Sequence, residues 1–269
     1  MKKNVFRSTY LVLSLCLLGM LATSCDELED VFPIGKDTKT KVYYGPATAL
    51  GHGTVSSWVK TGKDGKPLAI GFKVSADALA MLEDLPSQMY FLSLPQQAGV
   101  MPYQTLELDW NQHGHEPEGV YTLPHFDFHF YMISKDDVMN IAGGPDPGAN
   151  TLLEKGVLPT VYTFGPEPIA VPQMGVHWAD VTSPEYSPAG FSKTFIYGSH
   201  GDKVSFLEPM ITRAYLMSLD ENESVKTSIP QLLKFEKKGY YPGTYTVTYD
   251  AQQDAYLVSL TDLKWHNAD

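Results

Sequence analysis

Cysteine is nearly absent from this 269-residue sequence, which contains only Cys16 and Cys25. Cys16 falls in a segment with the pattern of a removable signal, so we expect the mature chain to lack an internal disulfide. Long apolar runs are missing after residue 24, where no stretch reaches the ~20 residues that a membrane-spanning helix needs. Removal of 24 residues from 269 leaves 245, which is long enough for a hydrophobic core to stabilise the fold.

Basic residues are also few, since 20 Lys and Arg stand against 31 Asp and Glu, a formal charge of −11. Lys2, Lys3 and Arg7 lie in the first 24 residues, and their removal leaves 17 basic side chains and a charge of −14. This acidity argues against electrostatically driven binding to nucleic acid or anionic lipid, so we expect no nucleic-acid partner. The hydrophobic fraction of 43% is typical of a globular protein.

The N-terminus has the features of a bacterial lipoprotein signal. Two lysines precede an apolar stretch from Tyr10 to Ala22, which at about 13 residues is too short for a good membrane anchor. The stretch ends in Leu21-Ala22-Thr23-Ser24-Cys25, which resembles a lipobox, although Ala22 stands where leucine is usual. We predict a signal peptide over 1–24 and a lipid on Cys25 that makes the membrane a partner. The alternative is an ordinary signal peptide followed by an incidental cysteine.

An acidic run, Asp26-Glu27-Leu28-Glu29-Asp30, follows the cysteine. It resembles sorting signals that send some bacterial lipoproteins to the outer membrane or the cell surface, and a solvated tether explains it equally well. We predict a flexible acidic tether over 25–40 and a lipid-anchored location in the cell envelope, at the outer membrane or surface of a Gram-negative bacterium. A single mostly β domain is expected over 41–269, with a subdivision near 95–104 kept open.

Short strand patterns dominate the rest of the chain. Segments rich in aromatic or β-branched residues and bounded by Gly, Pro, Asn or Asp predict strands. These segments are 54–60, 68–74, 88–92, 105–110, 125–133, 194–197, 203–207, 244–249 and 256–260. Ser75 and Ser134 are predicted to cap two short helices. The fold class is therefore mainly β, a sandwich or barrel-like antiparallel sheet with a few short helices.

Prolines are concentrated between Gly143 and Gly190, a segment that holds eight of the 19 in the chain. Because proline lacks a backbone N–H, this segment cannot contribute many central strands. We predict an ordered, proline-rich loop layer or a lid over the sheet.

The segment 124–132, Pro-His-Phe-Asp-Phe-His-Phe-Tyr-Met, concentrates side chains that can do chemistry. Alternate residues of a strand point to opposite faces, so its phenylalanines share one face and its polar residues the other. The polar face carries His125, Asp127, His129 and Tyr131. An ordinary solvent-facing strand would more often carry Thr, Lys, Ser and Glu. The face therefore lines a site or forms a hydrogen-bonded network.

Strand geometry limits how these side chains share a metal ion. At ~3.3 Å per residue, the Cα atoms of His125 and His129 lie about 13 Å apart, too far for both imidazoles to bind one ion comfortably. Asp127 is within reach of either histidine. A metal site is therefore expected to use one neighbouring pair and to recruit ligands from elsewhere in the chain.

Three further residues are candidates for such recruitment. His115 lies in a loop just before the strand, near one end of it if 105–110 pairs with it. His177 and Glu208 lie in apolar settings, where an unpaired carboxylate is costly to bury. The candidate metal ligands, not all on one ion, are His115, His125, Asp127, His129 and His177, and Glu208 is the candidate general base.

Each of these residues also has a structural explanation. The polar residues of the strand could form a satisfied network without metal, because carboxylate–histidine hydrogen bonds also occur alone. His115 could cap its loop, His177 could be a core histidine, and Glu208 could pair with Arg213 or a nearby lysine. The other histidines, expected to be structural or exposed, are His52, His113, His200 and His266.

Motifs of several enzyme classes are missing. The sequence has no Gly-x-Ser-x-Gly nucleophile elbow, no Walker motif and no complete dinucleotide-binding glycine motif. The segment 198–202 contains Ser, His and Asp, but neighbours within one turn cannot face each other as a catalytic triad.

Taken together, the motifs resemble a family of uncharacterised bacterial envelope proteins, classed as a domain of unknown function. The resemblance runs from about Gly45 to Tyr215. It is carried by Trp110-Asn111, Gly114–Pro117, Pro124–Tyr131, Gly175–Trp178 and Phe206–Met210. It implies that these segments meet in space, and it implies no reaction.

The first functional hypothesis is an exported lipoprotein whose β domain binds a divalent metal ion, zinc being the default for nitrogen and oxygen ligands. Its catalytic form is metal-assisted hydrolysis, with Glu208 or an unligated histidine as general base. The alternative is a non-catalytic envelope module whose histidine face binds a small molecule, forms a polar network or supports a homo-oligomer interface. A third hypothesis is a pH-responsive network, since imidazoles near carboxylates titrate around neutral pH.

Overall fold

A computed structural model describes residues 39–80 and 82–269, all of which belong to one compact unit. The predicted signal peptide, Cys25 and the predicted tether up to residue 38 lie outside the described residues. Within the described part of the chain, no helix is long and apolar enough to cross a membrane.

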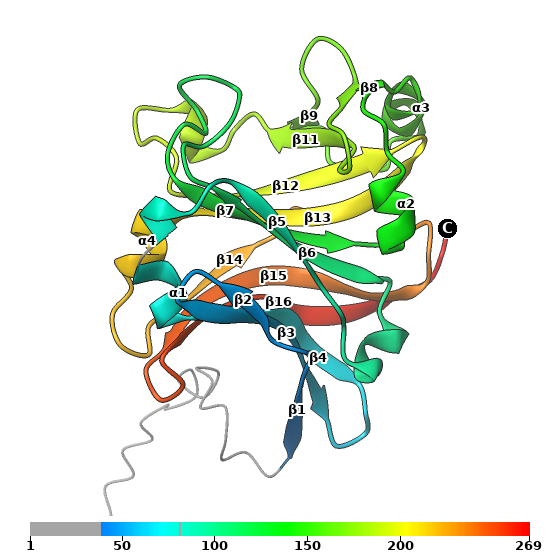
Figure 1. Cartoon of the computed structure of the whole chain (residues 1–269). Helices are drawn as coiled ribbons and strands as arrows, with labels where there is room; N and C mark the ends of the chain where they lie inside the picture. The colour runs from blue at the N-terminus through cyan, green and yellow to red at the C-terminus, as the bar shows by residue number, and fades with distance from the viewer. Residues whose placement is uncertain (1–38, 81) are drawn as a thin grey trace, which may run out of the picture. The chain divides into compact units, whose positions relative to one another are not determined.

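The strands form two large antiparallel sheets and one small one (Figure 1). The first large sheet has the order β1-β3-β4-β16-β15-β14, with β2 also paired to β3. Its strands are β1 (Thr40–Tyr44), β2 (Thr48–Leu50), β3 (Gly53–Gly62), β4 (Pro67–Ser75), β14 (Ser224–Ser228), β15 (Gly239–Asp250) and β16 (Ala255–His266). Strands from both ends of the domain thus meet where β4 pairs with β16.

The second large sheet comes from the middle of the chain, with the order β5-β6-β7-β13-β12-β11-β9. Its strands are β5 (Gln88–Leu92), β6 (Thr105–Asn111), β7 (His125–Tyr131), β9 (Tyr162–Thr163), β11 (Val176–Asp180), β12 (Lys193–His200) and β13 (Lys203–Thr212). The segments 105–110 and 125–133, whose pairing the sequence analysis considered only as a condition for the place of His115, pair as β6 and β7.

The remaining elements are short. They are α1 (Ala76–Ala80), η1 (Leu82–Asp84), η2 (Gln96–Val100), α2 (Lys135–Met139), β8 (Gly144–Pro145), α3 (Gly148–Lys155), β10 (Ile169–Ala170), η3 (Pro184–Tyr186) and α4 (Arg213–Met217). Ser134 caps α2 as predicted, because its hydroxyl accepts a hydrogen bond from the Asp137 N–H and the Asp137 carboxylate accepts one from the Ser134 N–H.

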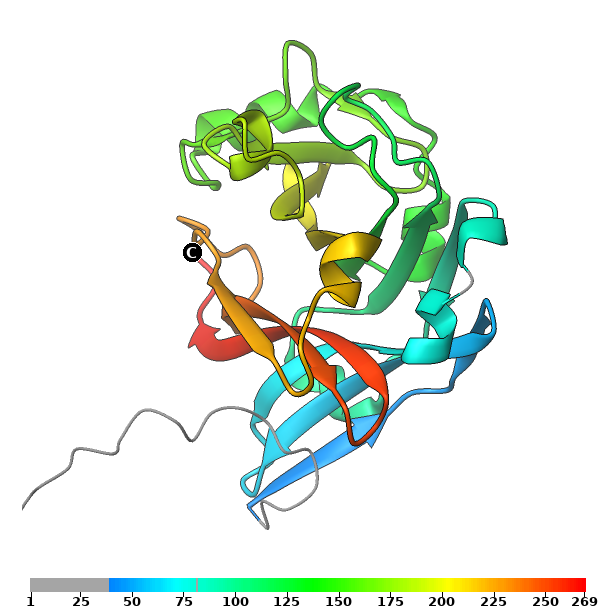
Figure 2. The same ribbon diagram turned by 90° about the vertical axis from the view of Figure 1, so that its left-hand side faces the viewer.

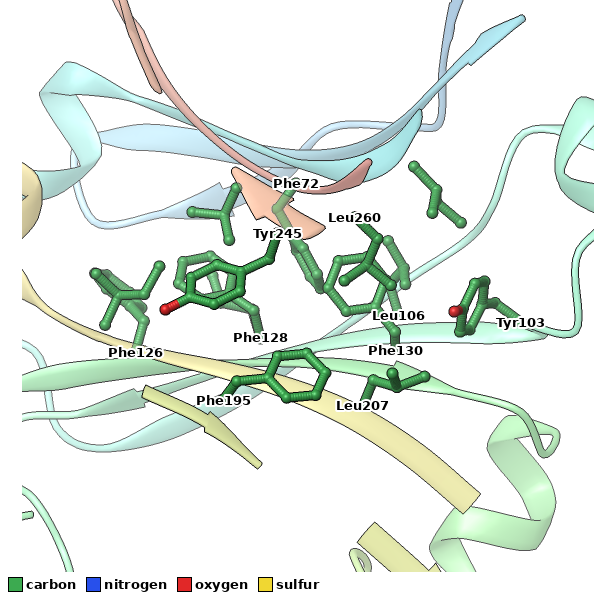
Figure 3. Packing of buried hydrophobic residues seen from close by; sticks show 14 of the residues in the cluster. Phe72, Tyr103, Leu106, Phe126, Phe128, Phe130, Phe195, Leu207, Tyr245 and Leu260 are labelled. Carbon is green, nitrogen blue, oxygen red and sulfur yellow. The ribbon is translucent and has the colours of Figure 1, made fainter. Parts of the chain in front are cut away.

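The core lies between the two large sheets, and this confirms the sandwich form of the predicted fold. The Phe72 ring on β4 lies 5.2 Å from the Phe128 ring and 5.1 Å from the Phe130 ring on β7, measured between centroids. Figure 3 shows these rings among other buried apolar side chains between the layers. The phenylalanine face of β7 is therefore core, and its opposite face points away from the first sheet.

The proline-rich segment lies on that opposite side of the second sheet. Figures 1 and 2 both show 144–190, in green to yellow-green, on the side of the sheet away from β15 and β16. The segment adds β11 and the two-residue β9 at the edge of the sheet and no central strand. It covers the polar face of β7.

Strand β13 is longer than its sequence pattern predicts, because it continues past Leu207 to Thr212. Pro209 lies inside it. On either side of the proline, Leu207 pairs with Phe130 of β7 and Met210 pairs with Asp127. A proline within a run argues against a central strand, so the sequence-based strand ended too early. The extension places Glu208 on the same sheet as His129.

Candidate functional site

The polar face of the second sheet is assembled by strand register. In the pairing of β6 with β7, Glu107 lies opposite His129, Asp109 opposite Asp127, and Asn111 opposite His125. Residues opposite one another in an antiparallel pair point to the same face. The acidic side chains of β6 therefore join the histidines of β7.

This face is polar and yet buried. His125 and His129 are 0% exposed, and Glu107 and Glu208 are 1% exposed. Burial of a charged group costs several kcal/mol unless it is paired or bound to a cation. The concentration of buried imidazoles and carboxyl groups at one place therefore requires protons or cations to balance it.

The first group consists of His115, His125 and Asp127, whose ligand atoms lie within 4.8 Å of one another. Nε2 of His125 is 3.1 Å from Oδ1 of Asp127, and Nε2 of His115 is 3.4 Å from Oδ2. The Asn111 amide donates a hydrogen bond of 2.7 Å to Oδ2 and holds the carboxylate in place. One carboxylate is thus flanked by two imidazoles.

Backbone carbonyls determine which nitrogen of each imidazole carries a proton. Nδ1 of His125 lies 2.6 Å from the Leu123 carbonyl oxygen, and Nδ1 of His115 lies 2.6 Å from that of Glu116. A carbonyl oxygen only accepts, so each Nδ1 donates, and in the neutral ring Nε2 keeps its lone pair. Both lone pairs then face the carboxylate of Asp127, an arrangement that repels unless a proton or a metal cation lies between the atoms.

The electrostatics of the first group favour positive charge beside Asp127. Burial alone would raise the pKa of Asp127, but the imidazoles of His115 and His125 hold it well below its usual range. Burial lowers the pKa of His115, and its hydrogen bond and attraction to Asp127 raise it by more. The carboxylate is therefore ionised and ready to bind a cation.

The second group consists of His129, His177 and Glu208, whose ligand atoms also lie within 4.8 Å of one another. Nε2 of His129 is 3.6 Å from Oε1 of Glu208, and Nε2 of His177 is 3.5 Å from Oε2. Burial raises the pKa of Glu208 well above its usual range and lowers the pKa of His177 to about 3. His177 is thus a neutral imidazole at neutral pH, the form that binds metals.

The carboxyl group of Glu107 lies behind the His129 ring. Its Oε2 lies 2.7 Å from Nδ1 of His129, on the opposite side of the ring from Glu208. Burial raises the pKa of Glu107 to about 8, and burial together with the charge of Glu107 raises that of Asp109 to about 9. His129, Glu107 and Asp109 also lie close enough to form a third ligand group. A carboxylate behind a histidine is the usual support of a metal-binding imidazole.

A glycine on β12 makes room for the ring that packs against the second group. A Cβ at Gly198 would lie 1.9 Å from Cε1 of Phe206, so any side chain would displace this ring. The Phe206 ring centroid lies 5.0 Å from that of His129 and 5.2 Å from that of His177. Gly198 therefore permits the packing that holds both imidazoles.

A cleft of about 810 Å³ lies against both groups. Its lining includes His115 and Asp127 of the first group and His177 of the second. The two groups are therefore accessible from one cavity, although His125, His129 and Glu208 lie behind its surface.

The structure brings together all six candidate site residues of the sequence analysis and keeps the other histidines apart from them. Nδ1 of His200 lies 3.4 Å from Asp146, the His266 ring stacks on Phe235, and His52 and His113 are exposed. Glu208 lies beside the imidazoles of His129 and His177 at the distances given above. Arg213, the alternative partner considered for Glu208, donates from its Nε to the Leu79 carbonyl oxygen.

Sequence reasoning missed Glu107, Asp109 and Asn111. The signal was present, because 106–111 reads Leu-Glu-Leu-Asp-Trp-Asn, an alternation that places two acids and an amide on one face. The pairing of this segment with 125–133, which the sequence analysis left as a condition, places that face beside the histidines.

Comparisons with protein-family models, curated proteins and solved structures found no match. The interpretation of this site therefore depends on its geometry.

Proposed function

We propose that this protein binds divalent metal ions through the first and second groups. The observation that supports this most directly is the pair of Nε2 lone pairs aimed at Asp127, because a cation between these atoms converts a repulsive arrangement into a coordination shell. Two histidines and one carboxylate in each group match the three protein ligands of a catalytic zinc site. Zinc is the default ion for this donor set.

The two groups are best assigned to two separate ions. Asp127 and His129 are two positions apart on β7, which corresponds to a separation of about 7 Å. Two-metal centres that share a reacting group place their ions roughly 4 Å apart. We therefore infer two mononuclear sites on one sheet face.

Metal-assisted hydrolysis is the reaction class that such sites support. A bound ion with three protein ligands keeps a position for water, whose pKa it lowers toward neutrality. The two oxygens of Glu208 face two different imidazoles, which favours a ligand role over the general-base role that the sequence suggested.

We also propose that the protein is an exported lipoprotein anchored through Cys25 in the cell envelope. The support is the order of charged, apolar and small residues before this cysteine. The acidic run behind it is consistent with a tether or a sorting signal.

A metal-free polar network is the second candidate function. Asn111 already donates a hydrogen bond to Asp127. Protonated imidazoles of His115 and His125 would donate to the same carboxylate, which would then be satisfied without a metal ion. In that case the stability of the protein would depend on pH and would be unaffected by a chelator.

The test is zinc affinity in the purified mature domain and in two variants of the same loop. His115→Ala removes a ligand of the first group, and His113→Ala removes an exposed histidine two positions away. We expect His115→Ala to weaken the binding of one ion by at least about tenfold and His113→Ala to leave it unchanged. A domain that takes up no zinc, or equal affinities in both variants, would refute a metal site at the first group.

A further inference from the structure

The cleft beside the two groups has apolar walls. They are formed by Phe164, Ile169, Val171, Met174, Val181 and Ile196. Three of these side chains, Ile169, Val171 and Val181, are 51%, 41% and 55% exposed. Exposed apolar side chains that gather around one cavity indicate a ligand site more than scattered exposure does.

The size of the cleft fits a small organic molecule. About 810 Å³ lies within the range of roughly 300–1,000 Å³ that is usual for such sites. Both ligand groups reach the same cavity, the first through His115 and Asp127 and the second through His177. One occupant could therefore contact a metal ion and the apolar walls together.

Charge restricts the polar end of that occupant. Among the described residues that line the cleft, none is a lysine or arginine, and the acids Glu116 and Glu167 are exposed. An anion would therefore find no lysine or arginine among these described residues of the cleft. A divalent ion held by a single carboxylate ligand would retain positive charge and an open position, and would supply the attraction for an anion there.

We propose that the cleft binds an apolar carboxylic acid, whose carboxylate completes the coordination of a metal ion and whose hydrocarbon body packs on the apolar walls. This inference rests on the proposed metal binding. It adds the chemical class of the ligand: an acid with a long hydrocarbon chain or a ring rather than a short, fully polar acid.

Calorimetry with hexanoate, octanoate and decanoate tests the proposal on zinc-loaded and chelator-treated protein. In the zinc-loaded protein, we expect each added methylene to tighten binding by up to about fourfold. We expect chelator-treated protein to bind decanoate at least about tenfold more weakly, and 1-decanol to show no dependence on zinc. Equal binding of decanoate with and without zinc overturns the proposal.

Two matched variants test the walls. Val181→Gln changes an exposed apolar residue of the cleft, and Leu233→Gln changes one that is 58% exposed and does not line the cleft. We expect Val181→Gln to weaken decanoate binding by at least about fivefold with unchanged zinc content, and Leu233→Gln to have no effect. Equal affinities in the two variants overturn the proposal.

Zinc content, measured first, separates the two possible failures. A protein that holds zinc but binds none of the acids refutes the ligand class and leaves metal binding intact. A protein that takes up no zinc refutes the proposed function, and this inference falls with it.

Discussion

His125 and Asp127 lie two positions apart on one buried strand, with Nε2 of the imidazole 3.1 Å from Oδ1 of the carboxylate. The other ring nitrogen, Nδ1, lies 2.6 Å from the Leu123 carbonyl and must donate to it. A neutral His125 therefore presents a lone pair to an anion. This relationship underlies the proposal that a cation belongs between the two residues.

The number of bound ions should depend on His177. His177→Ala removes a ligand of the second group that is 24% exposed, so its loss is less disruptive than that of a fully buried histidine. We expect the zinc stoichiometry, measured by elemental analysis, to fall from two ions per chain to one. His200→Ala removes an exposed histidine outside both groups and should leave two. Retention of two ions by His177→Ala would contradict the assignment of this residue.

Glu107 should strengthen the affinity of the second group for its ion without itself being a ligand. Glu107→Leu removes the oxygen 2.7 Å from Nδ1 of His129, and support of this kind typically changes metal affinity by about 10- to 100-fold. We expect a loss of that size for one ion only, in a competition titration against a chelating dye. Glu107→Gln keeps an acceptor oxygen and should lose less. If both variants bind zinc as the wild type does, Glu107 has no such role.

The stability of the metal-free protein should fall as pH rises from about 6.5 to 8.5. The pKa of Glu107 is about 8 and that of Asp109 about 9 in the folded protein, whereas unfolded carboxyl groups have pKa values of about 4. Until the pH passes its folded pKa, each group keeps a proton in the folded state that the unfolded state has already lost, so each lowers the free energy of unfolding by up to about 1.4 kcal/mol per pH unit.

Neighbouring groups do not reverse that sign. His177, whose folded pKa is lowered to about 3, opposes the effect only until the unfolded imidazole has lost its proton near pH 6.5, and Asp127, whose folded pKa is lowered, is ionised in both states throughout the window. Thermal melts in the presence of a chelator measure the effect, and Glu107→Gln should reduce the slope. Zinc should stabilise the protein more at the higher pH, since its ligands bind in their deprotonated forms. A melting temperature that rises with pH in chelator would contradict this account.

The opposite face of the same strand should control stability. Phe128 is fully buried and packs against Phe72 across the sandwich. Phe128→Ala should cost about 3–5 kcal/mol, measured as a lower midpoint of urea unfolding with an unchanged slope. Phe128→Leu keeps most of the volume and should cost less. A loss below about 1 kcal/mol for the alanine variant would show that the core collapses to fill the space.

Much of the fold follows from local patterns that the sequence displays. The period-two alternation in 125–131 predicted both faces of β7, and the strand rise predicted that His125 and His129 belong to different groups. The cap at Ser134 is likewise a short-range feature. These signals were readable because a strand or cap depends on neighbours a few residues away.

Long-range partners were harder to predict for the opposite reason. That β16 pairs with β4, or that β13 continues through Pro209, depends on which strands meet across the whole chain. Local propensity carries no information on that choice, and at Pro209 it pointed the wrong way. Glu107 was missed because an acid on a strand is usually solvent-facing, and its burial becomes evident only once β6 is paired and covered.

The mainly β fold, and the strand that carries imidazoles and a carboxylate on a single face, could be read from the order of the amino acids. Which atoms meet on that face depends on how the distant parts of the chain pack together. This packing brought His115 to Asp127, and His177 and Glu208 to His129, and it fixed the ring nitrogens through backbone carbonyls. The physical reason is that side-chain alternation is set within a strand, whereas ligand geometry is set by register between strands and by the loops that cover them.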